Sequence, residues 1–233
     1  MDCIAGMSMI PDGSIDMILT DLPYGVTDCY WDSLLPLDQL WRQYERVIKP
    51  NGAIVLTACQ PFTTTLIGSN RRHFKYCWYW RKNIATGFPF AKFQPLRCIE
   101  DVAVFYRQAP TYNPQGLVAL EQPRIRQKRV KTDCIYKMAT LNKEYATHYT
   151  NYPRNLLEVK SERGQHPTQK PVALFEYLIN TYTNPGELVL DSCMGSGTTA
   201  VACIRTDRRY VGFEIDDKYY ALSQERIRKE LAA

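Results

Sequence analysis

Strand-like apolar runs alternate with helical stretches at both ends of this 233-residue chain. Residues 15–20 and 53–57 form such runs, and residues 37–48 between them carry apolar side chains at helical spacing. Residues 76–80 and 102–106 are two further strand candidates. Strands that alternate with helices usually build a mostly parallel sheet with helices on both faces. The first half of the chain therefore predicts an α/β fold.

The alternation returns in the last third of the chain, after a central part without a clear period. The expected elements are a helix over 172–181, a strand over 187–190, a helix from about Thr198, a strand over 210–214 and a helix over 217–231. We therefore expect residues 1–106 and 164–233 to form two halves of one doubly wound domain. Residues 107–163 would be an insertion between them.

A glycine-rich loop joins the strand over 187–190 to the helix that follows it. Its sequence is Asp191-Ser192-Cys193-Met194-Gly195-Ser196-Gly197-Thr198-Thr199. Glycines allow backbone N–H groups to approach a ligand closely, and the helix N-terminus favours a negative group. Glu214 follows Asp191 by 23 residues, at the end of the next strand, where an acid commonly accepts hydrogen bonds from ribose hydroxyls. Together these features predict a nucleoside pocket, although a Gly-x-Gly loop alone can be a simple tight turn.

Two common nucleotide motifs are incomplete in this loop. Ala200 stands where a dinucleotide-binding GxGxxG would have its third glycine, and no Gly-Lys-Ser/Thr follows as in a phosphate-binding loop. A nicotinamide-dependent oxidoreductase is therefore the weaker interpretation.

A second loop, Asp21-Leu22-Pro23-Tyr24, follows the first apolar run. The Asp21 carboxylate and the main-chain carbonyl of Leu22 are two acceptors that can hold both protons of an exocyclic amine. They would orient the nitrogen lone pair and stabilise the positive charge that develops when it attacks a methyl group. Tyr24 can stack on the base. Taken alone, the tetrapeptide also fits a simple turn with a packed tyrosine.

The central part of the chain holds the excess positive charge. Residues 107–165 contain eleven Lys/Arg and five Asp/Glu, a net +6, whereas the rest of the chain has eighteen basic and nineteen acidic residues, a net −1. A localised basic region is typical of proteins that bind the phosphate backbone of nucleic acids. The candidates for phosphate contacts are Arg124, Arg126, Lys128, Arg129 and Lys131. The same run is also compatible with an ordinary solvated basic loop.

Several classes of protein are disfavoured by composition. No apolar run approaches the ~20 residues of a membrane span, and the N-terminal residues do not resemble a signal peptide. The eight cysteines are scattered without a CxxC pair, and there are only three histidines, so we expect no metal site. Scattered thiols fit a reducing cytoplasm, which is the expected location.

The two loops together resemble the DNA amino-methyltransferase family in its β arrangement. In that arrangement a catalytic Asp-Pro-Pro-Tyr comes first, a target-recognition segment follows, and the cofactor loop comes last. This chain has Asp21-Leu22-Pro23-Tyr24, the basic segment and the 191–199 loop in that order. His166-Pro167-Thr168-Gln169-Lys170-Pro171 also looks like a family element. The resemblance implies a Rossmann-like methyltransferase fold with a seven-stranded, mostly parallel sheet, and S-adenosylmethionine as cofactor.

The resemblance also implies roles for individual residues. Asp2, after a very short N-terminal strand, would lie near the cofactor's adenine, and Ile215 would pack on that ring. Thr168 and Lys170 would lie near the methionine end, where Lys170 could pair with the carboxylate. The rest of the cofactor site would comprise Asp191, Cys193, Gly195, Ser196, Gly197, Thr198 and Glu214. Leu22 and Met194 depart from the family pattern, and neither change suggests an inactive enzyme.

Asp in the first position of the catalytic loop goes mostly with adenine N6 in this family, and Ser with cytosine N4. Asp21 therefore favours adenine, with cytosine as the alternative, in double-stranded DNA from which the base is flipped out. An RNA or protein methyltransferase and a non-catalytic DNA-binding relative remain further alternatives. Many relatives dimerise, so a homodimer is a candidate assembly, and the sequence leaves a cognate restriction nuclease open.

Overall fold

The computed structural model describes residues 1–25, 32–126, 145–162 and 169–232. These residues form two compact units. The larger unit contains residues 1–113 and 155–233, and the smaller contains residues 114–154. The smaller unit thus lies within the 107–163 segment that lacked a clear period.

Seven strands of the larger unit form one sheet, in the order β7-β3-β4-β2-β1-β8-β9. The pairs of β1 with β2 and β8, β8 with β9, and β3 with β7 are parallel, whereas β4 is antiparallel to both β2 and β3. The strands are β1 (Ile15–Asp21), β2 (Ile48–Ala58), β3 (Phe74–Thr86), β4 (Arg97–Phe105), β7 (Leu156–Glu158), β8 (Leu188–Asp191) and β9 (Arg209–Gly212). The expected seven-stranded, mostly parallel sheet is confirmed.

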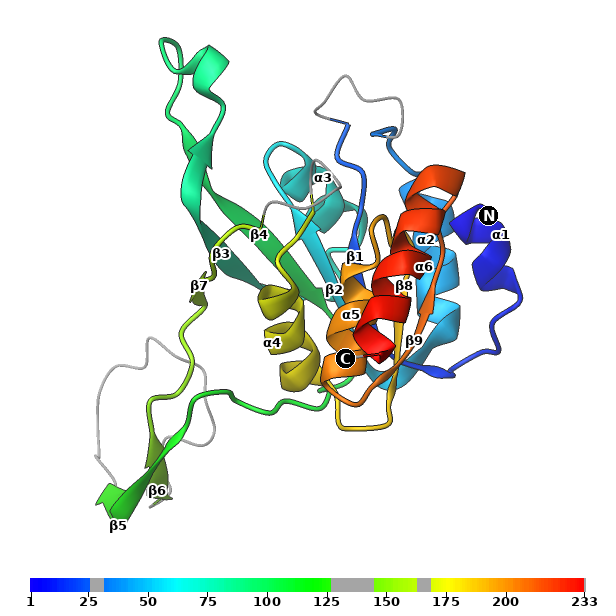
Figure 1. Ribbon diagram of the computed structural model, residues 1–233. Coiled ribbons are helices and arrows are strands. Elements are labelled where there is room, and N and C mark those ends of the chain that lie inside the picture. The colour runs from blue at the N-terminus through cyan, green and yellow to red at the C-terminus, as the bar shows by residue number, and fades with distance from the viewer. Residues whose placement is uncertain (26–31, 127–144, 163–168, 233) are drawn as a thin grey trace. The chain divides into compact units, whose positions relative to one another are not determined.

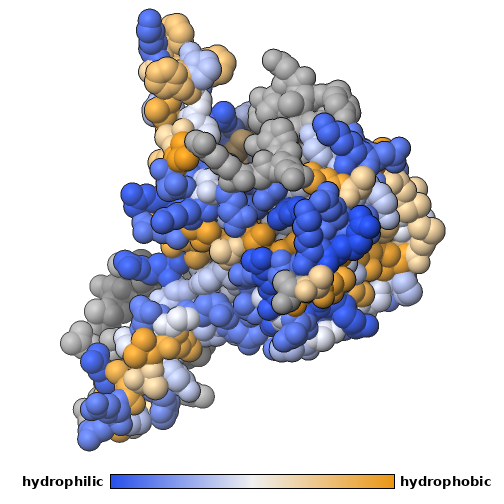
Figure 2. Space-filling view, viewed as in Figure 1, coloured by the Kyte–Doolittle hydropathy of each residue, from blue (hydrophilic) through white to orange (hydrophobic). Residues whose placement is uncertain are grey.

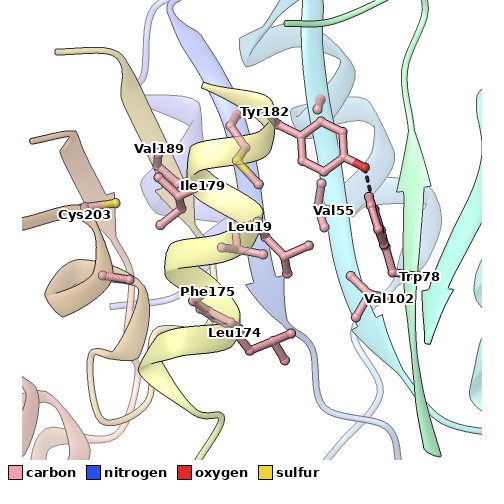
Figure 3. Packing of buried hydrophobic residues seen from close by; sticks show 14 of the residues in the cluster. Leu19, Val55, Trp78, Val102, Leu174, Phe175, Ile179, Tyr182, Val189 and Cys203 are labelled. Carbon is pink, nitrogen blue, oxygen red and sulfur yellow. Dashed lines mark hydrogen bonds between the residues drawn. The ribbon is translucent and has the colours of Figure 1, made fainter. Parts of the chain in front are cut away.

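One face of the sheet packs against α4 (Val172–Tyr182) and α5 (Thr198–Arg205), and α6 (Asp217–Leu231) contacts α5 (Figure 1). Met17 and Leu19 of β1 point to this side and join the apolar core under α4. Figure 3 shows the centre of this cluster, where Phe175, Ile179 and Tyr182 of α4 meet the strands.

The opposite face packs against α1 (Cys3–Ser8), α2 (Leu37–Val47) and α3 (Phe62–Ser69). Ile18, between Met17 and Leu19, belongs to this second core. Successive strand residues point to opposite faces, and residues 15–20 of β1 are all buried. This explains why the central strand appears in the sequence as a continuous apolar run.

The order in which the chain adds strands to the sheet reverses at β1. From β1 the chain proceeds to β2 on one side, while β8 pairs on the other side and is followed by β9. In open α/β sheets, ligands bind outside the carboxyl ends of the strands at such a switch point. Asp21 ends β1 and Asp191 ends β8, so the two candidate loops lie at the same edge of the sheet.

β3 and β4 extend beyond the sheet as a long hairpin with a short 3-10 turn, Phe88–Phe90, at its end (Figure 1). Apolar side chains gather at the tip of this hairpin in Figure 2, and Phe88, Phe90 and Phe93 are exposed there. Arg97 and Ile99, on the β4 side of the hairpin, line the main cavity described below. The hairpin therefore borders the site and exposes an apolar tip.

The smaller unit contains an antiparallel pair, β5 (Val118–Arg126) and β6 (Tyr145–Thr150). Its sequence from 114 to 154 has eight Lys/Arg and three Asp/Glu, a net +5. This unit therefore carries most of the positive charge of the basic region.

Most of the expected elements are present, with ends that shift by a few residues. The prediction of a short strand before Asp2 is wrong, because Asp2 is the N-cap of α1 and its carboxylate accepts a hydrogen bond from the backbone N–H of Ala5 at 2.9 Å. α3 was not expected from the sequence, because its residues include three consecutive threonines. Among the described helices, none combines the length and apolar character that a membrane crossing requires.

A buried hydrogen-bond chain under α4 generates the first prediction. The indole N–H of Trp78 donates to the Tyr182 hydroxyl at 2.6 Å (Figure 3). The Tyr76 hydroxyl lies 2.8 Å from the same oxygen. Tyr182→Phe should lower the free energy of unfolding by ~1–3 kcal/mol, because the buried indole N–H loses its acceptor. Tyr76→Phe leaves that acceptor in place and should cost less. Urea denaturation of both variants tests this, and equal losses would contradict it.

Candidate active site

A cavity of ≈ 890 Å³ lies at the carboxyl edge of the sheet in the larger unit. Its volume is in the range of small-molecule and cofactor sites. Both predicted loops line it, as do the N-terminal residues, α6 and the base of the β3–β4 hairpin. The catalytic and cofactor candidates therefore share one cavity, as expected from the neighbouring ends of β1 and β8.

Asp21 is the most heavily hydrogen-bonded side chain of the first loop. Its Oδ1 accepts from the Tyr24 hydroxyl at 2.6 Å and from the Thr57 hydroxyl. Its Oδ2 accepts from the Lys170 ammonium at 2.8 Å. Thr57 is the register partner of Asp21 on the parallel strand β2. The carboxylate is thus fixed in orientation, with Oδ1 occupied by neutral donors and Oδ2 by a cation.

Lys170 is 6% exposed and contacts two carboxylates. Besides Asp21, its Nζ lies 3.4 Å from Oε2 of Glu100. Burial works against a charged lysine, but Asp21 and Glu100 together raise the pKa of Lys170 above its ordinary value. Glu100 in turn accepts from the Lys82 ammonium at 2.8 Å. Two buried cations and two carboxylates therefore balance each other beside the cavity.

Tyr24 is positioned through both its backbone and its ring. The Asp32 carboxylate accepts the backbone N–H groups of Tyr24 and Gly25 at 2.7 and 2.8 Å. The ring stacks on Phe62, with centroids 5.5 Å apart and an interplanar angle of 27°. Burial, followed by the charges of Asp21 and Glu100, raises the pKa of Tyr24 well above its usual value, so the hydroxyl stays protonated.

The 191–199 loop is organised by Asp191. This buried carboxylate accepts the backbone N–H of Cys193 at 3.1 Å and the hydroxyl of Thr199. Gly197, the N-cap of α5, has a φ of +81°, and a Cβ there would lie 3.0 Å from the Cβ of Ser223. Only glycine meets both conditions without strain. The loop thereby turns tightly into α5 along the cavity wall.

Glu214 lies two residues beyond the end of β9 and is tied to the loop. Its Oε2 accepts from Gly195 N–H at 2.8 Å, and its Oε1 accepts from the N–H groups of Ile215 and Asp216 at 2.9 and 2.8 Å. A carboxylate offers about four acceptor positions, so one position remains for a ligand hydroxyl. Ile215 is 70% exposed and lines the cavity, which leaves its side chain available to a planar ring.

The structure brings most of the predicted cofactor residues to the cavity wall. These are Asp2, Lys170, Asp191, Cys193, Gly195, Ser196, Thr198, Glu214 and Ile215. Thr168 lies outside the described residues. The pairing of Lys170 with a cofactor carboxylate stays a prediction, since its ammonium contacts Asp21 and Glu100 here.

The candidates for DNA contacts are only partly described. Arg124 is exposed on β5, and Arg126 ends that strand. Lys128, Arg129 and Lys131 lie outside the described residues. Their role in binding DNA remains a prediction.

The sequence analysis missed five residues that support the site. They are Asp32, Thr57, Phe62, Lys82 and Glu100. Thr57 could have been found, because it ends the strand expected beside Asp21. Glu100 had no such signal, since it comes from a strand that runs antiparallel to its neighbours. Within the described ranges, no group of three or more His, Cys, Asp or Glu side chains could hold a metal ion.

This arrangement is that of an α/β protein whose cavity can accommodate a nucleoside-type ligand on one side of the switch point, with an acid–tyrosine loop on the other. The sequence model of the DNA methylases that modify N6 or N4 amines matches residues 15–225, and the chain belongs to this family.

Individual relatives are similar to this chain at low sequence identity. The DNA adenine methyltransferase YhdJ of Escherichia coli K12 is 25% identical over 97% of this chain and 80% of its own length. The structure of M1.HpyAVI in complex with SAM has a TM-score of 0.65, with 23% identity, and 97% and 96% of the two chains are covered. The cytosine-N4-specific PvuII DNA methyltransferase has a TM-score of 0.70, with 18% identity, and 100% and 89% are covered. The two structures show that the fold is shared.

The buried Asp191 generates a prediction for pH. Burial, only partly offset by its hydrogen bond with Thr199, raises the pKa of Asp191 from 3.8 to about 7. An acid whose pKa is raised by folding stabilises the fold when protonated, so this contribution is complete below about pH 4 and is lost as the pH rises through about 7. Asp191→Asn should therefore become more stable relative to the wild type across that interval.

Urea denaturation at several pH values measures this difference. Asp38→Asn, at an exposed position on α2, is the matched control and should show no such trend. A difference between Asp191→Asn and wild type that does not change with pH would contradict the prediction.

Proposed function

We propose that this protein transfers a methyl group from S-adenosylmethionine to the N6 amine of adenine in DNA. The observation that carries the proposal is the shared cavity, in which the Asp21 carboxylate and the 191–199 loop meet at the ends of two adjacent parallel strands. Such a cavity can bring a cofactor and a second substrate into contact.

The residues of the 191–199 side fit the cofactor. Glu214 is held by three backbone N–H groups and retains an acceptor position for a ribose hydroxyl. Ile215 offers an exposed apolar surface for the adenine ring, and Asp2 lies on the same wall. When bound, S-adenosylmethionine supplies a methyl group on a positively charged sulfur, which departs as a neutral thioether.

The residues of the Asp21 side fit an exocyclic amine. Oδ2 of Asp21 would accept one amine proton and the Leu22 carbonyl the other, which aims the nitrogen lone pair at the methyl group. The Asp21 charge would stabilise the positive charge that develops on nitrogen. The Tyr24 ring, held by Phe62 and by the hydrogen bonds to Asp32, would stack on the base.

Adenine is proposed over cytosine because the loop begins with Asp21, which in the resembled family goes mostly with adenine. YhdJ, which is named as an adenine methyltransferase, is similar to 97% of this chain. Cytosine N4 is the second candidate, since its amine presents similar protons to the same acceptors.

The smaller unit is proposed to hold the DNA. Its net charge of +5 and its exposed Arg124 suit the phosphate backbone. The base would have to leave the duplex to reach a site at the end of β1.

Asp21→Ala tests the catalytic assignment. It should lower methyl transfer to unmethylated DNA by on the order of 100-fold or more, because the amine loses its charged acceptor. The affinity for S-adenosylmethionine should stay within a few-fold, because Glu214 and the 191–199 loop are untouched. Asp38→Ala, at an exposed position on α2, is the control and should keep full activity. Unchanged turnover in Asp21→Ala would refute the mechanism.

Arg124→Ala tests the DNA-binding assignment. It should weaken binding to duplex DNA of any sequence and reduce the slope of log affinity against log salt by about 1. Fluorescence anisotropy with a labelled duplex at several salt concentrations measures both. Arg42→Ala removes an exposed arginine from the larger unit and should change neither quantity. Equal effects of the two substitutions would argue against a DNA-binding role of the smaller unit.

A further inference from the structure

We propose that Lys170 occupies the position of the target amine in the base-free site, and that Glu100 accepts the displaced ammonium when the base enters. This inference rests on the proposed function and deepens it, because it identifies Glu100 as a positioning residue for the reaction.

Lys170 makes the two contacts that the proposed function assigns to the target base. Its Nζ donates to Oδ2 of Asp21 at 2.8 Å and lies over the Tyr24 ring, 5.3 Å from the centroid. An ammonium is an N–H donor like an exocyclic amine, and it is attracted to the face of an aromatic ring. Oδ1 of Asp21 already has two donors, so Oδ2 is the oxygen at which the two nitrogens compete.

The displaced ammonium needs another acceptor, because the site is buried. A buried cation separated from its anion is strongly destabilising. Lys170 is 6% exposed, and the carboxylates around it keep it charged. Moving to solvent would require the side chain to leave this pocket, whereas a small shift keeps it among negative groups.

One oxygen of Glu100 is in ionic contact with Lys170 but accepts no hydrogen bond from it. Its Oε2 is buried, lies 3.4 Å from Lys170 Nζ, and forms no hydrogen bond with any described residue. Buried carboxylate oxygens are rarely left in this condition, so the atom calls for an explanation. Its other oxygen, Oε1, accepts from Lys82 at 2.8 Å, which orients Oε2 toward Lys170.

The exchange keeps the charges balanced. In the base-free site Lys170 donates to Asp21 and is in ionic contact with Glu100, and Lys82 donates to Glu100. After the exchange the neutral target amine donates a hydrogen bond to Asp21, and Glu100 is paired with the ammonium groups of both Lys170 and Lys82. The Asp21 carboxylate is thereby paired before the base arrives and keeps its orientation throughout.

Glu100→Gln is the first test. An amide removes the charge that would receive Lys170, so the ammonium should remain on Asp21 and compete with the base. With labelled S-adenosylmethionine and unmethylated plasmid DNA, we expect kcat to fall at least about tenfold or KM for DNA to rise by a similar factor. The Kd for S-adenosylmethionine should stay within about twofold. Glu158→Gln, which alters an exposed glutamate of β7 paired with Arg81, is the matched control and should be unchanged.

A second substitution separates competition from damage to the fold. Adding Lys170→Met removes the competing ammonium, so the double variant should be several-fold more active than Glu100→Gln alone. If the two substitutions only damaged the structure independently, their losses of activity would add, and the double variant would be slower than Glu100→Gln. Glu100→Asp keeps the charge and should retain more activity than Glu100→Gln. Lys170→Met alone should keep the Kd for S-adenosylmethionine within a few-fold, whereas pairing with the cofactor's carboxylate would weaken it at least about tenfold.

The outcomes are distinct. Wild-type rates in Glu100→Gln, or a double variant no faster than Glu100→Gln, would overturn the inference while leaving the proposed function intact. A large loss of cofactor affinity in Lys170→Met would also overturn it. A wild-type enzyme that binds S-adenosylmethionine and methylates no DNA would overturn the proposed function and this inference with it.

Discussion

The parallel pairing of β1 with β8 determines where the chemistry of this protein can take place. It aligns Met17 with Val189 and Ile18 with Leu190, so that Asp21 and Asp191 emerge at one edge of the sheet although 170 positions separate them in the sequence. The apolar cores on both faces hold the two strands in this register, because a shift by one residue would turn every side chain of β1 to the other face. The cofactor candidates and the acid–tyrosine loop share one cavity as a direct consequence.

Ionic interactions dominate the Asp21 side of this cavity. Lys170 and Lys82 face Asp21 and Glu100, and all four side chains are largely shielded from water. Charges in such a place are strongly coupled, since little solvent screens them. A ligand that displaces one partner must therefore leave the others satisfied. The proposed methyl transfer would depend on that balance, as well as on the position of Asp21.

The sequence was informative where local patterns determine structure. The run over 15–20 and the loop at 191–199 predicted β1, β8 and α5, because burial on both faces and a glycine with positive φ leave clear signals. Asp2 lines the cavity, but it caps a helix instead of following a strand, because the expected strand came from the family resemblance and not from a local pattern. Glu100 and Phe62 could not be predicted, because their approach to Tyr24 and Lys170 depends on the pairing of β4 and the packing of α3. Residues 107–163 show neither helical nor strand periodicity, so their excess positive charge was the one property from which a function could be predicted.

The identity of the methylated product is the most direct test of the proposed reaction. The protein is incubated with isotopically labelled S-adenosylmethionine and unmethylated DNA, and the DNA is then digested to nucleosides for mass spectrometry. Methyl transfer to adenine predicts labelled N6-methyladenine. Label in N4-methylcytosine would contradict the assignment drawn from Asp21 while preserving the shared cavity as the site of transfer. DNA that remains unlabelled, with the cofactor bound, would contradict the proposed function itself.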